Sequence, residues 1–333
     1  MSGNDAAAAP MGRMLCIASA LLLAVGAGAA AAQERYPART VRIIVPTSAG
    51  GVTDVLARVI AQGLTQAWGQ SVIVDNRPGA DQIIGTEAVA RSAPDGYTLM
   101  VSSDAAITGN PHLHRNLRYD SLKDFTPLVM LGQITPVLNV PSSLPVRSFG
   151  ELVALAKAKP GALNYASFGS GTYSHLSMED LKQRTGIDLF HIVYKGSTPA
   201  ITALLRGEIS VLIVNMGNIR ANAAAGTIRI LAAAGAKRSA FLPDLPTIAE
   251  SGVPGFSTGA WWGLFAPANL PRDIADKIRT GVGAILASPE ARKLYETQTI
   301  ERITLTPDEF DKLIRDDLDK WGRLIRAVGI KPH

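Results

Sequence analysis

VRIIVPTSAGGVTDVLARVIAQGLTQAW, residues 41–68, is the stretch that decides the fold. Its first five residues form an apolar run that ends at a proline, which predicts a buried strand. From residue 52 onward, apolar residues recur at the spacing of one helical face, which predicts a helix. The small residues between these two parts predict a tight turn. Strand, turn and helix in this order form the unit from which parallel α/β sheets are built.

The same alternation of short apolar runs and helical segments continues to the C-terminus. Further strands are predicted at residues 71–74, 97–101, 136–140, 163–167, 189–194, 209–214, 228–233 and 261–266. Residues suited to helix N-caps precede several helical segments, namely Ser148, Thr198, Ser288 and Thr306. The alternation predicts mainly parallel sheets with helices on their faces. About ten strands are many for one doubly wound sheet, which favours two α/β lobes.

The composition excludes several classes of protein. Of 333 residues, 47% are hydrophobic and 18% are charged, and there is one cysteine. These values exclude intrinsic disorder, a disulfide-rich scaffold and a coiled coil. The formal net charge of +5 at pH 7 is not gathered into a basic stripe. We therefore expect no nucleic-acid partner.

The N-terminus predicts a cleaved secretory signal peptide. Residues 14–32 are apolar, follow Arg13 and end in an A-x-A-like pattern at Ala30 and Ala32. This arrangement favours a signal peptide over a membrane-spanning helix. Removal of residues 1–32 leaves a chain without cysteine, and its expected location is the periplasm.

The turn PTSAGGVTD, residues 46–54, is the first candidate binding site. Small residues let backbone N–H groups face an anion at a helix N-terminus, where the helix dipole also favours negative charge. The turn lacks the lysine of a P-loop and the spacing of a dinucleotide fingerprint, so a nucleotide is not expected. A plain turn capped by Thr53 or Asp54 remains the alternative.

A second glycine-rich turn, ASFGSGTYSH at residues 166–175, follows a strand in the same way. It offers several hydroxyl groups, which suit an oxyanion: Ser167, Ser170, Thr172 and Ser174. Two such turns in matched strand–helix positions predict a ligand clamped between two lobes.

Catalytic patterns are sparse. The sequence has no G-x-S-x-G elbow and no H-E-x-x-H motif, and its five histidines form no metal-ligand set, so neither metal nor cofactor is expected. His175 is placed to donate to a ligand carboxylate. An enzyme acting on a small acid stays an alternative, with Asp54, Asp104 or His175 as acid or base, but no paired nucleophile and base support it.

Together these segments resemble the Bug-type (TctC-like) extracytoplasmic solute-binding receptors of tripartite tricarboxylate transporters. The resemblance rests on blocks in family order at residues 35–80, 93–101, 110–128, 165–176, 191–209, 242–256 and 261–271. It implies a two-lobed α/β periplasmic binding protein, a type II-like Venus flytrap, in which helices flank a mixed, mainly parallel sheet in each lobe. Residues 36–138 and 236–333 would form the first lobe, and residues 139–235 the second.

The resemblance also implies which residues hold the ligand. One ligand carboxylate would lie between the two glycine-rich turns, partly held through ordered waters. The implied contacts are Thr47, Ser48, Ala49, Gly50, Gly51 and Asp54 in the first turn, and Ser167, Gly169, Gly171, Thr172, Ser174 and His175 in the second, beside the Ser170 hydroxyl noted above.

Three departures from the family pattern bear on the ligand. Thr47 stands where an aromatic residue is usual, and Asp81 and Gln82 stand where small residues are frequent. Asn215 replaces an acidic residue that can meet an amino group on the ligand, so we expect Asn215 to line a site for a carboxylate without an amino group.

The expected function is capture of a small di- or tricarboxylic or aromatic acid and its delivery to the membrane permease subunits of the transporter. The receptor is expected to act as a monomer without bond chemistry. A sensor that docks to a membrane kinase is an alternative, because both roles would present the same closed surface.

Overall fold

The computed structural model describes residues 36–169, 172–194 and 196–332. The predicted signal peptide lies outside these residues, as do Ser170 and Gly171 of the second turn. The compact unit Arg39–His333 holds all of the described helices and strands. No helix in the described part of the chain combines the length and the apolar composition needed to cross a bilayer.

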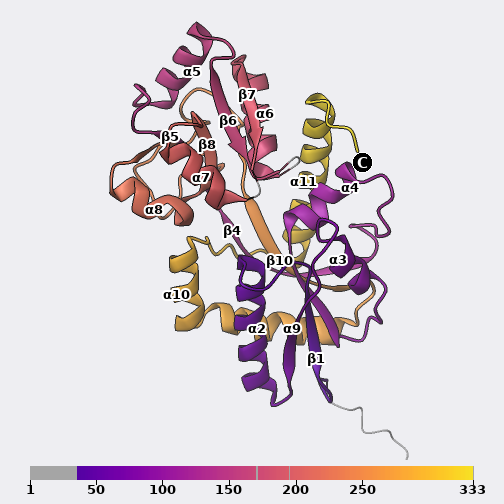
Figure 1. Cartoon of the computed structure of the whole chain (residues 1–333). Coiled ribbons are helices and arrows are strands. Elements are labelled where there is room, and N and C mark those ends of the chain that lie inside the picture. Colours follow the sequence, from indigo (N-terminus) through magenta and orange to yellow (C-terminus); the bar gives the residue numbers. More distant parts are fainter. Residues whose placement is uncertain (1–35, 170–171, 195, 333) are drawn as a thin grey trace, which may run out of the picture. The chain divides into compact units, whose positions relative to one another are not determined.

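Two five-stranded mixed sheets form the framework (Figure 1). The first has the order β2 (Val72–Asn76), β1 (Val41–Val45), β3 (Thr98–Ser103), β10 (Ala260–Pro267), β4 (Phe125–Ile134). The second has the order β7 (Leu189–Val193), β6 (Leu163–Ser167), β8 (Val211–Asn215), β5 (Pro136–Pro141), β9 (Ile228–Ala233). In the first sheet β1 pairs in parallel with β2 and β3, and β10 pairs antiparallel with β3 and β4. In the second sheet β6 pairs in parallel with β7 and β8, and β5 pairs antiparallel with β8 and β9.

The chain passes between the two sheets at two places. Only Thr135 separates β4 in the first sheet from β5 in the second. The chain returns between β9, in the second sheet, and β10, in the first. The strands that follow the two passages, β5 and β10, run against the direction of the other strands in their sheets, so their pairs are antiparallel. The lobe boundaries given above stay a prediction.

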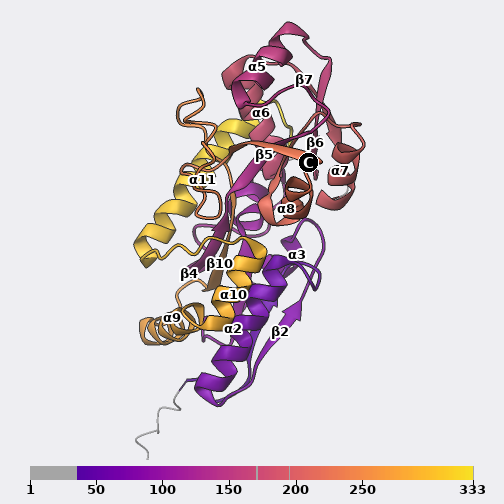
Figure 2. The same ribbon diagram turned by 90° about the vertical axis from the view of Figure 1, so that its left-hand side faces the viewer.

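Helices cover the first sheet on both faces. They are α2 (Val52–Trp68), α3 (Ile83–Ala90), the π-helix η2 (Ala105–Gly109), α4 (Asn110–Leu113), α9 (Arg272–Leu286), α10 (Pro289–Gln298) and α11 (Pro307–Ala327). Helices α2, α9 and α10 pack together, as Figure 2 shows. Ile107 of η2 and Phe310 and Ile314 of α11 join one core cluster with Met100 of β3 and Phe265 of β10.

The second sheet is covered by α5 (Phe149–Ala158), α6 (Tyr173–Thr185), α7 (Ser197–Leu205) and α8 (Met216–Ala224). Alternate residues of β8 face opposite sides, as expected for a strand. Val211 and Ile213 join the cluster that includes residues of α5 and α6, whereas Leu212 and Val214 join the cluster with residues of α7 and α8. Both faces of this sheet are therefore buried.

The predicted N-caps hold at three helices. Ser148, Ser288 and Thr306 accept hydrogen bonds from backbone N–H groups of α5, α10 and α11. The cap predicted at Thr198 is wrong, because α7 begins at Ser197 and Gly196 is its N-cap. Gly196 has φ 111°, a conformation that glycine adopts freely and that starts the helix earlier.

Candidate ligand-binding site

A cavity of about 350 Å3, here called the central cavity, is lined by residues from both sheets' elements. From the first-sheet side come Thr47, Val52, Thr53, Gln82, Ser103, Asp104, Ala105, Gly109, Ala260, Trp262 and Trp321. From the second-sheet side come Phe168, Thr172, Tyr173 and Leu176. Several of these residues follow the carboxyl ends of β1, β3 and β6, where ligands bind in open α/β sheets.

Asp54 fixes the shape of the first turn. Its Oδ2 accepts hydrogen bonds from the Gly50 N–H and from Arg58 Nε, both at 2.9 Å, and its Oδ1 accepts one from Asn76 Nδ2 at 3.0 Å. Burial alone would raise the pKa of Asp54, but these bonds hold the pKa below its usual value. Asp54 is thus ionised at pH 7 and stabilises the turn through these bonds, and it does not line the central cavity. The N-cap of α2 is Gly51, and not Thr53 or Asp54 as in the alternative of a plain capped turn.

Two first-turn residues, Thr47 and Thr53, line the central cavity with polar side chains. Thr53 Oγ1 accepts a hydrogen bond from Trp262 Nε1, whereas Thr47 Oγ1 is buried and has no hydrogen-bond partner among the described residues. A buried hydroxyl without a partner costs about 1–3 kcal/mol, so this atom is a place where a ligand oxygen would be stabilised. Ser48, Ala49, Gly50 and Gly51 are exposed beside it.

The hydroxyl groups of the second turn bond mainly within the turn. Thr172 Oγ1 donates to the Gly169 carbonyl at 2.7 Å and lies 3.0 Å from Ser174 Oγ, which accepts from the Phe168 N–H at 3.1 Å. Ser167 Oγ lies 2.7 Å from His191 Nε2. Of these predicted contacts, only Thr172 lines the central cavity. The others hold the loop in the shape that presents Thr172.

His175 lies inside the second-sheet half of the unit. Its ring stacks on His191 with centroids 4.2 Å apart, and His191 stacks on Tyr165 at 4.7 Å. Burial and the neighbouring His191 lower the pKa of His175 to about 4. His175 is therefore neutral at pH 7 and does not line the central cavity. His175 lies in the first turn of α6, and no local sequence pattern indicates that its ring packs against His191.

Asn215 joins the second sheet to α10. Its Oδ1 accepts from Thr299 Oγ1 at 2.8 Å, and its Nδ2 donates to the Gln298 carbonyl at 3.2 Å. The same Oδ1 caps α8 through the Gly217 N–H. All of these partners belong to the protein, and Asn215 does not line the central cavity. The expectation that this residue reads the ligand directly therefore has no support in the geometry.

Asp104 lines the central cavity, although the sequence analysis named it only as a possible acid or base of an enzyme. Its side chain is buried at the junction of β3 and η2. Burial and the nearby Asp317 raise the pKa of Asp104 to about 8, although backbone N–H groups and Lys320 act in the opposite direction. At pH 7 Asp104 is therefore mostly a neutral carboxylic acid, which can donate a hydrogen bond.

Asp54, Asp104 and His175 do not come together as an acid–base set. Of the three, only Asp104 lines the central cavity. Asp54 is held by Gly50, Arg58 and Asn76 in its own turn, and His175 is held in a ring stack. The described residues also form no cluster of His, Cys, Asp and Glu that fits a metal ion.

Among the residues that the structure describes, no lysine or arginine lines the central cavity. Its polar groups are neutral, and its apolar walls include Trp262, Trp321, Phe168 and Leu176. Trp262 Nε1 donates to Thr53 Oγ1 at 3.1 Å, and Ser103 Oγ donates to Gln82 Oε1 at 3.2 Å. These described residues offer a ligand anion neutral hydrogen-bond donors.

Comparison with known proteins identifies the family. Residues 56–330 match the model of the tripartite tricarboxylate transporter family receptor, TctC. The chain belongs to this receptor family. Protein BugT of Bordetella pertussis is 35% identical to this receptor over 322 residues, covering 96% of this chain and 99% of BugT.

Solved structures agree with this assignment. Rpa4515 of R. palustris with adipate is 35% identical, with a TM-score of 0.76 over 90% of this chain and 100% of the other. MatC from Rhodopseudomonas palustris with bound malate is 29% identical, with a TM-score of 0.72 over 87% of this chain and 100% of the other. The predicted family and the predicted two-lobed α/β fold are thereby confirmed.

Gln82, Ser103, Trp262 and Trp321 are cavity residues that the sequence analysis did not select. Gln82 carried a signal, because it departs from the small residues frequent at that position in the family. It precedes α3 with φ 75°, which turns the chain at this point. The tryptophans are contributed by β10 and α11, and no local motif marked them.

Proposed function

We propose that this TctC-family receptor captures a small carboxylate in the central cavity and performs no bond chemistry. The observation that carries the proposal is the buried, unpartnered Thr47 hydroxyl in a cavity lined from both sheets. The adipate and malate held by the two related structures support a carboxylate as the ligand class.

Neutral donors suffice to hold a carboxylate in such a cavity. A hydrogen bond from a neutral donor to a charged oxygen contributes about 1.5–3 kcal/mol. Thr47 offers an unpartnered hydroxyl and Gln82 offers an amide, whereas Ser103 and Thr172 would turn the hydroxyl hydrogens that they now donate to Gln82 and Gly169 toward the ligand. Several such bonds support micromolar binding, about −8 kcal/mol, after the ordering cost of binding.

We assign the direct contacts to Thr47 and Thr172, one from each turn. Other members of the predicted set shape these turns: Ser48, Ala49, Gly50, Gly51, Asp54, Ser167, Gly169 and Ser174. Ser170 and Gly171 stay predicted contacts of the second turn.

We further propose that the ligand lacks an amino group. This proposal now rests on Asp104 and no longer on Asn215. A neutral carboxylic acid at position 104 offers a hydrogen-bond donor to a second ligand carboxylate. As a family member the receptor would act in the periplasm, as a monomer, and would present its ligand to the permease subunits of the transporter.

A thermal-shift screen of di-, tri- and monocarboxylates, aromatic acids and amino acids tests this function. A ligand present at 100 times its Kd should stabilise the protein by about 2.7 kcal/mol. We expect a shift with one class of amino-free acid, and a shift of about half that size or less in the Thr47→Val variant. If no acid shifts ligand-free protein, or if an amino acid binds more tightly than its amino-free analogue, the proposal fails.

A further inference from the structure

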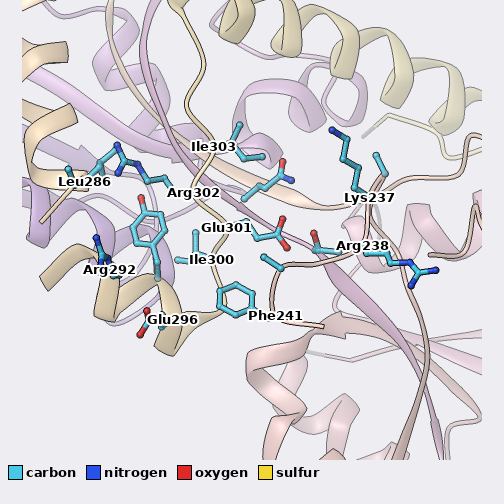
Figure 3. A pocket seen from close by; sticks show the side chains of 16 residues that line it. Lys237, Arg238, Phe241, Leu286, Arg292, Glu296, Ile300, Glu301, Arg302 and Ile303 are labelled. Atoms are coloured by element: carbon cyan, nitrogen blue, oxygen red, sulfur yellow. The ribbon is translucent and has the colours of Figure 1, made fainter. Parts of the chain in front are cut away.

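A second cavity, of about 640 Å3, lies beside the segments that join the two sheets (Figure 3). We call it the linker cavity. Thr135, between β4 and β5, lines it, as do residues 236–241 of the segment between β9 and β10. Its opposite wall comes from the end of α9, from α10 and from residues 300–303. It shares no lining residue with the central cavity.

Three cationic side chains of the linker cavity have no hydrogen-bond or ion-pair partner among the described residues. They belong to Lys237, Arg292 and Arg302. Arg238 differs from them, because its Nε donates to Glu250 Oε2 at 2.9 Å. In Figure 3, Arg292 and Arg302 lie on one side of the cavity and Lys237 on the other.

The carboxylates of the linker cavity do not neutralise these cations. Glu301 Oε1 accepts a hydrogen bond from Ser239 Oγ at 2.6 Å. Its backbone is paired with Gln133 of β4 through two hydrogen bonds, so Glu301 is fixed in the wall. Glu296 is exposed and forms no ion pair with Arg292. The arginine side chains are thus left available to an anion.

Between the cations the wall is apolar. Ile300 and Leu286 are buried, and Phe241 and Ile303 are half-buried, all of them lining the cavity. The volume lies within the range of small-molecule pockets, which combine apolar walls with a few polar groups. A guanidinium binds a carboxylate through two parallel hydrogen bonds. The lining therefore matches a ligand with an apolar body and one anionic group.

We infer that the linker cavity is a second binding site, which takes an amphipathic organic anion such as a monocarboxylate with an apolar chain. Arg292 and Arg302 hold its carboxylate, and Phe241, Leu286 and Ile300 contact its apolar body. Because the lining is separate from the central cavity, this site works independently of the ligand proposed above.

Octanoate is the probe, titrated calorimetrically into the purified full chain. We expect one binding event with the wild type and at least a tenfold loss of affinity, about 1.4 kcal/mol, in the double variant Arg292→Gln/Arg302→Gln. Both arginines are exposed, so these substitutions leave the core unchanged. Octyltrimethylammonium, with the same chain and the opposite charge, should not bind.

Two control variants separate the sites. Arg323→Gln removes one exposed charge from α11, away from the linker cavity, and should leave octanoate affinity unchanged. Thr47→Val should also leave it unchanged, because Thr47 lines the central cavity only. Absence of octanoate binding, equal binding to the double variant, or loss of binding in Thr47→Val would each overturn the inference. The first two outcomes leave carboxylate capture by the central cavity untouched, whereas the third would place octanoate in the central cavity; the thermal-shift screen tests that capture by itself.

Discussion

Replacing Asp104 by asparagine tests the electrostatics of the central cavity. The substitution keeps the size and polarity of the side chain and removes its titration. The pKa of Asp104 is raised from 3.8 to about 8 in the folded protein, so the folded state holds a proton that the unfolded chain releases above pH 4. The stability that this proton contributes is fully present below pH 4 and is lost as the pH rises through 8.

The magnitude follows from proton linkage. Each pH unit between 4 and 8 lowers the unfolding free energy of the wild type by up to about 1.4 kcal/mol through this group. Asparagine has no such dependence. The stability of Asp104→Asn relative to the wild type should therefore rise by about 3 kcal/mol between pH 5 and pH 8.

Neighbouring titratable groups interact with Asp104, so the pH dependence of the difference reports the titration of Asp104 together with these couplings. Burial raises the pKa of Asp317 and lowers the pKa of Lys320, both on α11. Burial raises the pKa of Tyr173 on α6 as well, and Asp104 adds to this effect. Lys320 is also influenced by Asp180 and Arg184 of α6.

Urea unfolding of the two proteins at pH 5, 6, 7 and 8 measures the difference. The same series with a bound dicarboxylate should show wild-type affinity falling as the pH approaches 8, because ionised Asp104 repels the ligand, whereas Asp104→Asn should bind equally at each pH. A stability difference that stays constant from pH 5 to pH 8 would refute the idea that Asp104 is protonated in the folded protein.

Three further substitutions test the site. Thr47→Val should weaken carboxylate binding by about tenfold or more and raise the unfolding free energy of the ligand-free protein by up to about 1–3 kcal/mol, because it removes a buried unpartnered hydroxyl; calorimetry and urea unfolding check both. Asp54→Asn should lower the unfolding free energy at pH 7 by about 1–3 kcal/mol by weakening the bonds to Gly50 and Arg58. Because the pKa of Asp54 is lowered, this difference should shrink on acidification below pH 4, and a constant difference would contradict it. His175→Phe should keep carboxylate affinity within about twofold, since the ring packs on His191 away from the cavity, and a larger loss by calorimetry would restore His175 as a ligand contact.

Local sequence patterns predicted most elements, but one strand escaped them. β4 contains Pro127 and Gly132, which argue against a strand in the interior of a sheet. The structure places β4 at the edge of the first sheet, paired with β10 through an irregular register. An edge strand tolerates a proline because one side of its backbone needs no ladder partner. This position depends on β10, far along the chain, and local patterns do not contain it.

The candidate site divides in the same way. The two glycine-rich turns follow β1 and β6 as predicted, because turn chemistry is local. Which of their hydroxyl groups are free is not local. Ser167 and Ser174 have the same side chain, yet one meets His191 of β7 and the other meets the Phe168 N–H. The sequence therefore predicted the turns, but not which of their side chains line the cavity and which bond to other parts of the protein.

The distribution of charge narrows the expected ligand. Among the described lining residues of the central cavity there is no cation, and the one carboxyl group, Asp104, is mostly neutral at pH 7. A tricarboxylate would place three charges against neutral donors in a partly apolar space, and each extra charge adds a desolvation cost that only a few hydroxyl groups offset. Trp262 and Trp321 favour a ligand with an apolar body between or beside its carboxyl groups. We therefore expect the screen to select a dicarboxylate with an aliphatic chain, or an aromatic acid, over citrate.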